Sequence, residues 1–183
     1  MSSSSMLMRI LEHHLKSRIM DKNTKIIFLD FDGCITTVKS HWRFDEEKMA
    51  LLGTILDATD AKIVITSSWR RYSLEDTIDF ITKREEERGH VPFAFPDRVI
   101  GVTDRMYAFC YPNMDKHYGV VRGEEIRRWQ GENDACECPY VILDDDTDML
   151  LWQKDNFVQT DSELGLSEDD CEKAIWILNK EDW

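Results

Sequence analysis

Short apolar runs, each followed at once by polar residues, constrain the fold of this chain more than any other feature. The clearest runs are residues 25–31 (KIIFLDF), 61–66 (AKIVIT) and 140–143 (YVIL), with weaker ones at 98–103 and 156–159. Continuous apolar runs of this length, without alternating polar residues, are typical of strands that are buried on both faces of a parallel sheet.

Segments with helical periodicity alternate with these runs. We expect helices over residues 44–58, 73–88, 122–130 and 167–178, with Asp45, Ser73 and Ser167 as N-caps. Strands that alternate with helices predict an α/β fold with a mainly parallel sheet, covered by helices on both faces. Ligands in such folds bind at the carboxyl ends of the strands.

The length of the chain, 183 residues, favours one sizeable domain. Residues 1–24 are expected to form a tail and an amphipathic helix, because apolar residues recur at helical spacing from Met6 to Met20. Residues 25–183 are expected to form a single domain. No apolar run approaches the roughly 20 residues needed to span a bilayer, and no secretory signal is evident.

Five cysteines occur without the pattern of a secreted disulfide framework, so the expected location is the cytoplasm. Cys136 and Cys138 form a C-x-C pair, but a zinc site needs two further ligands and the sequence has no second cysteine pair. We therefore interpret this segment as a polar loop with reduced thiols.

The net charge of −13 opposes binding to anionic membranes and to long nucleic acids. It does not exclude a local basic pocket. Extended nucleic-acid binding would require several arginines to gather in one patch, the candidates being Arg70, Arg71, Arg98, Arg105, Arg122, Arg127 and Arg128. The sequence leaves the oligomeric state open.

Carboxylates follow two of the predicted strands. Asp30 and Asp32 end the first, and Asp144 and Asp145 end the run YVIL. Four carboxylates at one sheet edge would repel one another and raise one another's pKa values, and a hard divalent cation relieves that repulsion. Oxygen ligands suit Mg²⁺, which keeps several waters and needs only two or three carboxylates.

These residue types also suit phosphoryl transfer. One Asp can attack phosphorus, while the second, two residues on, can protonate the leaving alcohol and then activate water. Gly33 permits a tight turn, and Thr66 or Ser67 offers a hydroxyl to the phosphate. Arg122, at a helix start, can supply the positive charge that the phosphoryl oxygens require.

Four segments in order, FLDFDGCIT, IVITSSWR, RGEEIRRW and VILDDDTDM, resemble the four motifs of the haloacid dehalogenase-like (HAD) superfamily. The residues in these motifs are similar to those of the HAD domain of Swiss Army Knife RNA-repair-like proteins. The resemblance implies a Rossmann-like, three-layer α/β/α fold, with residues 25–183 as a single catalytic domain and bound Mg²⁺.

The resemblance further implies that Asp30 is the nucleophile and Asp32 the general acid and base. It implies phosphate contacts from the second motif and Arg122, and metal ligation from Asp144 or Asp145 in addition to the first-motif aspartates. Gly33 and Arg70 complete the set of candidate phosphate-binding residues.

Several assignments stay open at this point. Arg122 stands where most members of the superfamily carry Lys, with Lys116 as a fallback. Arg70 can either bind phosphate or hold an acidic residue. Thr66, Ser67 and Ser68 compete for the phosphate, and Asp148 competes with Asp144 and Asp145 for the metal.

We therefore expect a Mg²⁺-dependent phosphohydrolase that acts on a phosphomonoester, such as a small phosphorylated molecule, a nucleotide or a nucleic-acid end. The gaps between motifs leave room for a minimal cap or none. Transfer of the phosphoryl group to an acceptor other than water, and a noncatalytic phosphate-binding module, are the alternatives.

Overall fold

A five-stranded sheet forms the centre of the molecule, and every strand pair in it is parallel. The computed structural model describes residues 20–106 and 120–180. The strand order is β3-β2-β1-β4-β5, with bounds β1 (Ile26–Leu29), β2 (Lys62–Ile65), β3 (Val99–Val102), β4 (Tyr140–Asp144) and β5 (Phe157–Gln159). The prediction of a mainly parallel sheet is confirmed.

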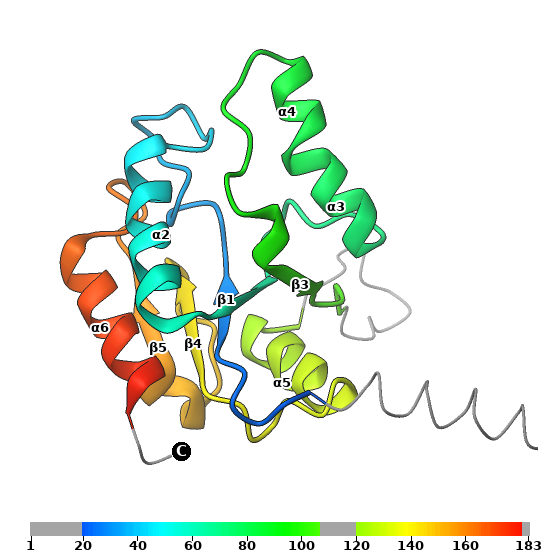
Figure 1. The fold of residues 1–183 in the computed structure, drawn as a ribbon, viewed down its shortest axis with the longest axis vertical. Helices are drawn as coiled ribbons and strands as arrows, with labels where there is room; N and C mark the ends of the chain where they lie inside the picture. The colour runs from blue at the N-terminus through cyan, green and yellow to red at the C-terminus, as the bar shows by residue number, and fades with distance from the viewer. Residues whose placement is uncertain (1–19, 107–119, 181–183) are drawn as a thin grey trace, which may run out of the picture.

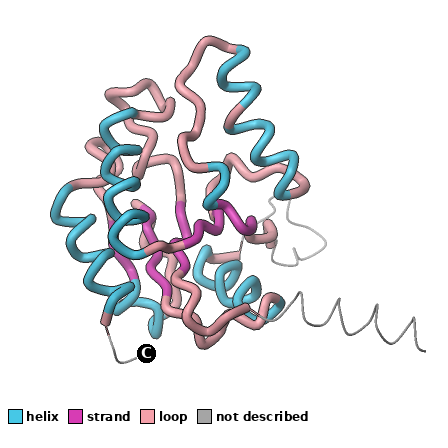
Figure 2. The backbone as a smooth tube through the Cα atoms, in the orientation of Figure 1, coloured by secondary structure: helices cyan, strands magenta, loops and turns pink. Residues whose placement is uncertain are grey.

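Helices cover both faces of this sheet, as Figures 1 and 2 show. Helices α2 (Glu46–Thr59) and α6 (Glu168–Asn179) lie side by side on one face, and α5 (Arg122–Glu132) lies on the other. The short helices α3 (Leu74–Ile81) and α4 (Lys83–Glu87) belong to the segment that connects β2 to β3 along the chain. Two 3-10 turns, η1 (Pro96–Arg98) and η2 (Leu151–Asn156), complete the described elements. The fold is therefore Rossmann-like, with three layers.

The apolar strands divide their side chains between two cores. On β1, Ile27 and Leu29 join the larger cluster with α2 and α6, whereas Ile26 and Phe28 join the smaller cluster with α5. The Phe28 ring packs edge-on against Trp129 of α5, with centroids 5.6 Å apart. Burial on both sides explains why the strands read as continuous apolar runs.

The predicted N-caps are present. The Asp45 side chain accepts from the backbone N–H of Glu47 at 2.9 Å, Ser73 caps α3, and Ser167 caps α6 in a reciprocal pair with Asp170. These bonds satisfy backbone donors that have no partner inside the helix.

The single helix predicted over residues 73–88 is wrong, because the structure divides it into α3 and α4. The break lies at Thr82, whose φ of −111° and ψ of −87° are not helical. The Thr82 N–H and hydroxyl both donate to the carbonyl of Ile78, at 3.0 Å and 2.7 Å, so α3 keeps its last helical bond and the chain changes direction after it. These two short helices are the candidate for the predicted minimal cap.

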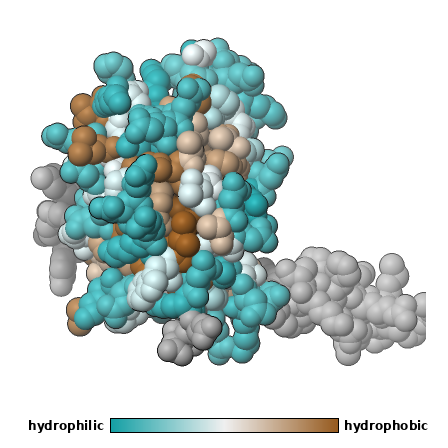
Figure 3. Space-filling view, turned by 60° about the vertical axis from the view of Figure 1, so that its left-hand side comes forward, coloured by the Kyte–Doolittle hydropathy of each residue, from teal (hydrophilic) through white to brown (hydrophobic). Residues whose placement is uncertain are grey.

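The predicted N-terminal helix, Met6 to Met20, lies almost wholly outside the described residues. Within the described part of the chain, no helix is both long and apolar enough to cross a membrane. Figure 3 shows the face that carries α2 and α6, which is mostly hydrophilic, with apolar side chains near its centre and in a group at the upper left.

Candidate active site

The strand register places the predicted site residues in one row. Leu29 of β1 pairs with Ile65 of β2 and with Leu143 of β4, so the residue that follows each of them lies at the same sheet edge. The backbone N–H of Asp30 donates to the Leu143 carbonyl at 2.9 Å. Asp30, Thr66 and Asp144 are thereby neighbours, although they lie far apart in the sequence.

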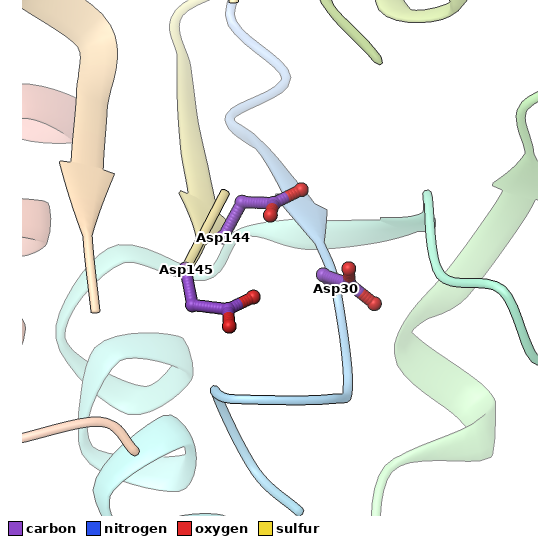
Figure 4. A group of neighbouring side chains, drawn as sticks. All are labelled: Asp30, Asp144 and Asp145. Atoms are coloured by element: carbon purple, nitrogen blue, oxygen red, sulfur yellow. The ribbon is translucent and has the colours of Figure 1, made fainter. Parts of the chain in front are cut away.

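Three carboxylates converge at this edge (Figure 4). One oxygen each from Asp30, Asp144 and Asp145 lies within 4.8 Å of the other two. Asp144 and Asp145 extend from the end of β4 toward Asp30 at the end of β1. Asp144 is fully buried, and its Oδ2 has no hydrogen-bond partner within the described residues.

The electrostatics of this cluster fit a bound cation. Burial, followed by the Asp30 carboxylate, raises the pKa of Asp144 to about 8. Burial is also the main reason why the pKa values of Asp30 and Asp145 are raised. Buried carboxylates so close together need positive charge, and an all-oxygen set suits a hard divalent ion.

Arg122 supplies the one positive side chain that directly contacts this cluster among the described residues. Its Nη2 lies 3.3 Å from Asp30 Oδ2, and its Nε lies 3.8 Å from Asp144 Oδ2. Burial alone would lower the pKa of Arg122, but the surrounding carboxylates, with Asp30 and Asp144 the strongest, together raise it. Nη1 is buried and has no hydrogen-bond partner within the described residues, so it is available to a ligand anion.

Contacts at the start of α5 hold Arg122 in place. Its backbone N–H donates to the Asp148 carboxylate at 2.8 Å, and the Gly123 carbonyl accepts from Gln153 Nε2 at 3.0 Å. A Cβ on Gly123 would lie 2.3 Å from Gln153 Oε1, so only glycine fits there. Asp148 therefore serves as a cap for α5 and is not part of the acidic cluster.

Asp32 is not one of the three carboxylates whose oxygens converge. Its carboxylate accepts from Thr36 Oγ1 at 2.9 Å, Ser68 Oγ at 3.1 Å and Trp69 Nε1 at 3.0 Å. These bonds hold the Asp32 carboxylate against the second motif, and its charge still contributes to the raised pKa of Asp30. Metal ligation by the Asp32 side chain has no support in these contacts and stays a prediction.

The three hydroxyl groups of the second motif, on Thr66, Ser67 and Ser68, have different hydrogen-bond partners. Thr66 is fully buried beside Asp30, and its Oγ1 has no hydrogen-bond partner in the described chain. A hydrogen bond from the Ser67 side chain counteracts the raised pKa of Asp30, and Ser68 bonds Asp32. Thr66 is thus the second-motif hydroxyl that is left free to meet a phosphate.

Gly33 permits a close approach between the two strand ends. Its φ is +69°, and a Cβ there would lie 2.4 Å from the Asp145 carboxylate. Its N–H donates to the Thr36 carbonyl at 2.9 Å, so it is already occupied. Phosphate binding by Gly33 stays a prediction, whereas its role in admitting Asp145 follows from the geometry.

Arg70 holds an acidic residue, one of the two alternatives left open by the sequence. Its Nη1 lies 2.8 Å from Glu125 Oε2 and also contacts Thr103. Both side chains of the pair are almost fully buried, and Glu125 Oε1 accepts from the Met106 N–H at 2.9 Å. These contacts commit Arg70 to linking the loop after β2 to α5, so its role as a phosphate ligand lacks support.

The seven arginines considered for a nucleic-acid patch are scattered. Arg98 pairs with Asp60 at the amino end of the sheet, and Arg127 and Arg128 pair with Glu124 and Glu132 on the exposed side of α5. A single basic surface therefore does not form from this set. Lys116, the fallback for Arg122, lies outside the described residues.

A family model for the HAD domain in Swiss Army Knife RNA repair proteins matches residues 26–171, most of the chain. The chain belongs to this family. The HAD domain implies phosphohydrolase chemistry on phosphorylated substrates, and its acidic cluster fits a HAD metal site. A search of curated proteins and a search of solved structures each found no match.

Some residues of this HAD domain were not singled out by sequence reasoning. Glu125 and Gln153 position the loop after β2 and the start of α5. Arg43, Phe80 and Arg88 line a pocket together with Ser68 and Trp69 of the second motif. The sequence pattern does not reveal the roles of these residues, because they act through contacts between segments that are distant in sequence. Asp148 was noticed in the run VILDDDTDM as an alternative metal ligand, but its hydrogen bond to the start of α5 was not predicted.

Proposed function

We propose that this HAD domain is a Mg²⁺-dependent phosphohydrolase that cleaves a phosphomonoester through an aspartyl-phosphate on Asp30. The observation that carries the proposal is the meeting of Asp30, Asp144, Asp145 and Arg122 at one sheet edge. A nucleophile, carboxylates suited to a cation and a phosphate-binding arginine thus share one small volume.

Asp30, Asp144 and Asp145 are the residues that would hold the metal, because their oxygens converge there. Mg²⁺ bound there supplies positive charge that neutralises the phosphoryl oxygens and the carboxylates around them. With that charge in place the pKa of Asp30 falls, which favours the ionised form needed for attack.

The Asp30 carboxylate attacks phosphorus, and the bond between phosphorus and the ester oxygen breaks. Arg122 binds equatorial oxygens of the phosphoryl group through the guanidinium that already lies 3.3 Å from Asp30. Thr66 Oγ1, which has no protein partner within the described residues, donates a further hydrogen bond. Electrostatic stabilisation and positioning thus come from two neighbouring elements.

Asp32 gives a proton to the leaving oxygen and then takes one from the water that hydrolyses the aspartyl-phosphate. Ser68 and Trp69 fix the orientation of its carboxylate at the boundary of the site. The Asp32 carboxylate is not among the three that converge on the proposed metal site, which suits a proton carrier that must reach the leaving group rather than the cation.

The test is phosphate release from a panel of phosphomonoesters, with and without Mg²⁺, by the wild type and Asp30→Asn. The panel contains p-nitrophenyl phosphate, nucleotides, sugar phosphates and 3′- or 5′-phosphorylated oligonucleotides. We expect release that requires both Mg²⁺ and Asp30, while Arg98→Gln, a control at the opposite sheet edge, keeps its activity. A folded protein that binds Mg²⁺ but releases phosphate from no member would count against the proposal.

A further inference from the structure

A pocket of about 330 Å³ opens next to Asp32. Its inner wall contains Ser68 and Trp69, the residues whose side chains hydrogen bond the Asp32 carboxylate. Its outer wall comes from the loop after β1 and from the segment between β2 and β3, including Trp42, Arg43, Arg71, Phe80 and Arg88. Two residues that line the pocket are thus hydrogen-bond partners of the proposed general acid.

The position of Asp32 determines what this pocket would hold. A general acid must lie within hydrogen-bond reach of the leaving oxygen, so the leaving group extends from the acidic cluster toward Asp32 and beyond. This pocket is lined by Ser68 and Trp69, the hydrogen-bond partners of Asp32, so it is the space in which such a leaving group would lie. Its chemistry therefore bears on the alcohol part of the substrate rather than on the phosphoryl group that is transferred.

The pocket carries more positive than negative charge. Arg43 and Arg88 share a single buried carboxylate, Glu85, at 3.9 Å and 2.9 Å. Arg71 has no carboxylate within 4.0 Å in the described part of the chain. Three arginines with one acidic partner favour an anionic ligand.

Arg71 is held ready for such a ligand. Its guanidinium carbon lies 3.6 Å from the centroid of the Phe80 ring, and its backbone N–H donates to Thr77 Oγ1 at 2.9 Å. Stacking on Phe80 fixes the plane of the guanidinium while its N–H edge stays free. Desolvation, followed by the like charges of Arg105, Arg84 and Arg88, lowers the pKa of Arg71, as expected for a cation without a counter-ion.

An aromatic side chain stands at the rim. Trp42 is 47% exposed, and both His41 and Trp42 have left-handed backbone conformations, with φ of 53° and 57°. Non-glycine residues in this region are strained, and such strain is concentrated at binding and active sites. The exposed indole offers a flat surface on which a base can stack.

We infer that this pocket binds the leaving group of a nucleotide that carries a second phosphate, with Arg71 binding that phosphate and Trp42 stacking on the base. The inference rests on the proposed function, because it places the leaving group beyond Asp32. The second phosphate can belong to a nucleoside bisphosphate or to the phosphodiester of a strand end, which share this chemistry.

Calorimetry with the Asp30→Asn protein in Mg²⁺ tests the site without turnover. Adenosine 3′,5′-bisphosphate is compared with adenosine 3′-monophosphate and 5′-monophosphate, and we expect it to bind at least about tenfold more tightly than either. Adding Arg71→Gln should bring the ratio close to one, whereas Arg71→Lys should restore part of it. Adding Arg98→Gln, which removes the same charge at the opposite sheet edge, should leave the ratio unchanged.

Equal affinities for the three nucleotides, or a ratio that survives Arg71→Gln, would overturn the inference. A dinucleotide with a terminal phosphate assigns the source: binding tighter than that of the bisphosphate supports a strand end, and equal or weaker binding supports the small molecule. If p-nitrophenyl phosphate is hydrolysed but the affinities are equal, the proposed function stands and the pocket inference fails. If the affinity ratio depends on Arg71 but the wild type releases phosphate from no substrate of the panel, the binding site is supported and the proposed hydrolase activity is contradicted.

Discussion

At the scale of single residues, Asp144 shows how the site depends on charge. Its side chain is fully buried, one oxygen has no hydrogen bond within the described residues, and its pKa is raised to about 8. A carboxyl group whose pKa is higher in the folded than in the unfolded state binds protons preferentially when folded. Its contribution to stability is therefore present below about pH 4 and declines as the pH rises to about 8.

Asp144→Asn should respond to pH and to metal differently from the wild type. Without metal at pH 8, the variant should melt at a higher temperature than the wild type, because a buried charge has been removed. Mg²⁺ should raise the melting temperature of the wild type more at pH 8 than at pH 5, and should hardly affect the variant. Thermal melts with and without Mg²⁺ at the two pH values measure this, and an equal Mg²⁺ response in both proteins would contradict it.

A substitution of Gly33 tests the same acidic cluster, because the backbone at Gly33 lies against Asp145. Ala at this position has to adopt a φ of +69° and places its Cβ against Asp145. We expect Gly33→Ala to lose more than about 1 kcal/mol of stability and to bind Mg²⁺ more weakly, because Asp145 is displaced. Gly89→Ala is the matched control, since Gly89 has a φ of +73° but no atom within 4 Å of a Cβ. Unfolding by urea and Mg²⁺ titration separate the two effects, and equal Mg²⁺ affinity in both variants would refute the role of Gly33.

At the scale of elements, a buried ion pair connects the loop after β2 to α5. Glu125→Gln leaves the Arg70 charge buried without its partner, so we expect a loss of about 3–5 kcal/mol in the free energy of unfolding. Glu124→Gln, one residue away, removes the surface pair with Arg127, which solvent screens, and should change stability far less. Similar losses in the two variants, measured by urea unfolding, would mean that the buried pair does not hold these elements together.

The elements also show what the sequence could predict. Strand positions and caps followed from short apolar runs and from Asp45, Ser73 and Ser167, because these signals are local. The meeting of Asp30 with Asp144 followed from the rule that parallel strands end at one edge.

Other features could not be predicted, because they depend on tertiary contacts. The break at Thr82 reflects the geometry of one residue inside a segment of helical composition. The ion pair of Arg70 with Glu125 and the hydrogen bond from Trp69 to Asp32 join residues from separate elements. No spacing in the sequence distinguishes these side chains from free ones.

At the scale of the whole molecule, charge limits the size of the substrate that can be bound. The net charge is −13, and Arg127 and Arg128 on α5 are paired with glutamates and do not line the pocket. The core also includes Ala174, Ile177 and Leu178, so α6 packs with the region that the family model matches and extends beyond its last residue. We therefore propose that the catalytic unit continues through α6.

This charge distribution predicts that the protein binds the end of a nucleic-acid strand and makes few contacts with the rest of the strand. The Kd of a phosphorylated dinucleotide and that of an oligonucleotide of about 20 residues with the same end should agree within about threefold, with a salt slope near about −1 on logarithmic axes. Fluorescence anisotropy over a salt series with Asp30→Asn provides the measurement. A steep slope and an affinity that increases with strand length would reveal a basic surface that these pairs do not provide.

The proposed mechanism requires that Asp30 becomes phosphorylated and that Asp32 carries the proton in both steps. Pre-steady-state kinetics of Asp32→Asn with p-nitrophenyl phosphate test it most directly, because p-nitrophenolate departs without a proton whereas hydrolysis of the intermediate needs a base. We predict a burst of about one p-nitrophenolate per active site, almost no turnover afterwards, and a phosphate on Asp30 by mass spectrometry of the acid-quenched protein. Steady turnover at the wild-type rate, with Asp30 unmodified, would contradict this mechanism.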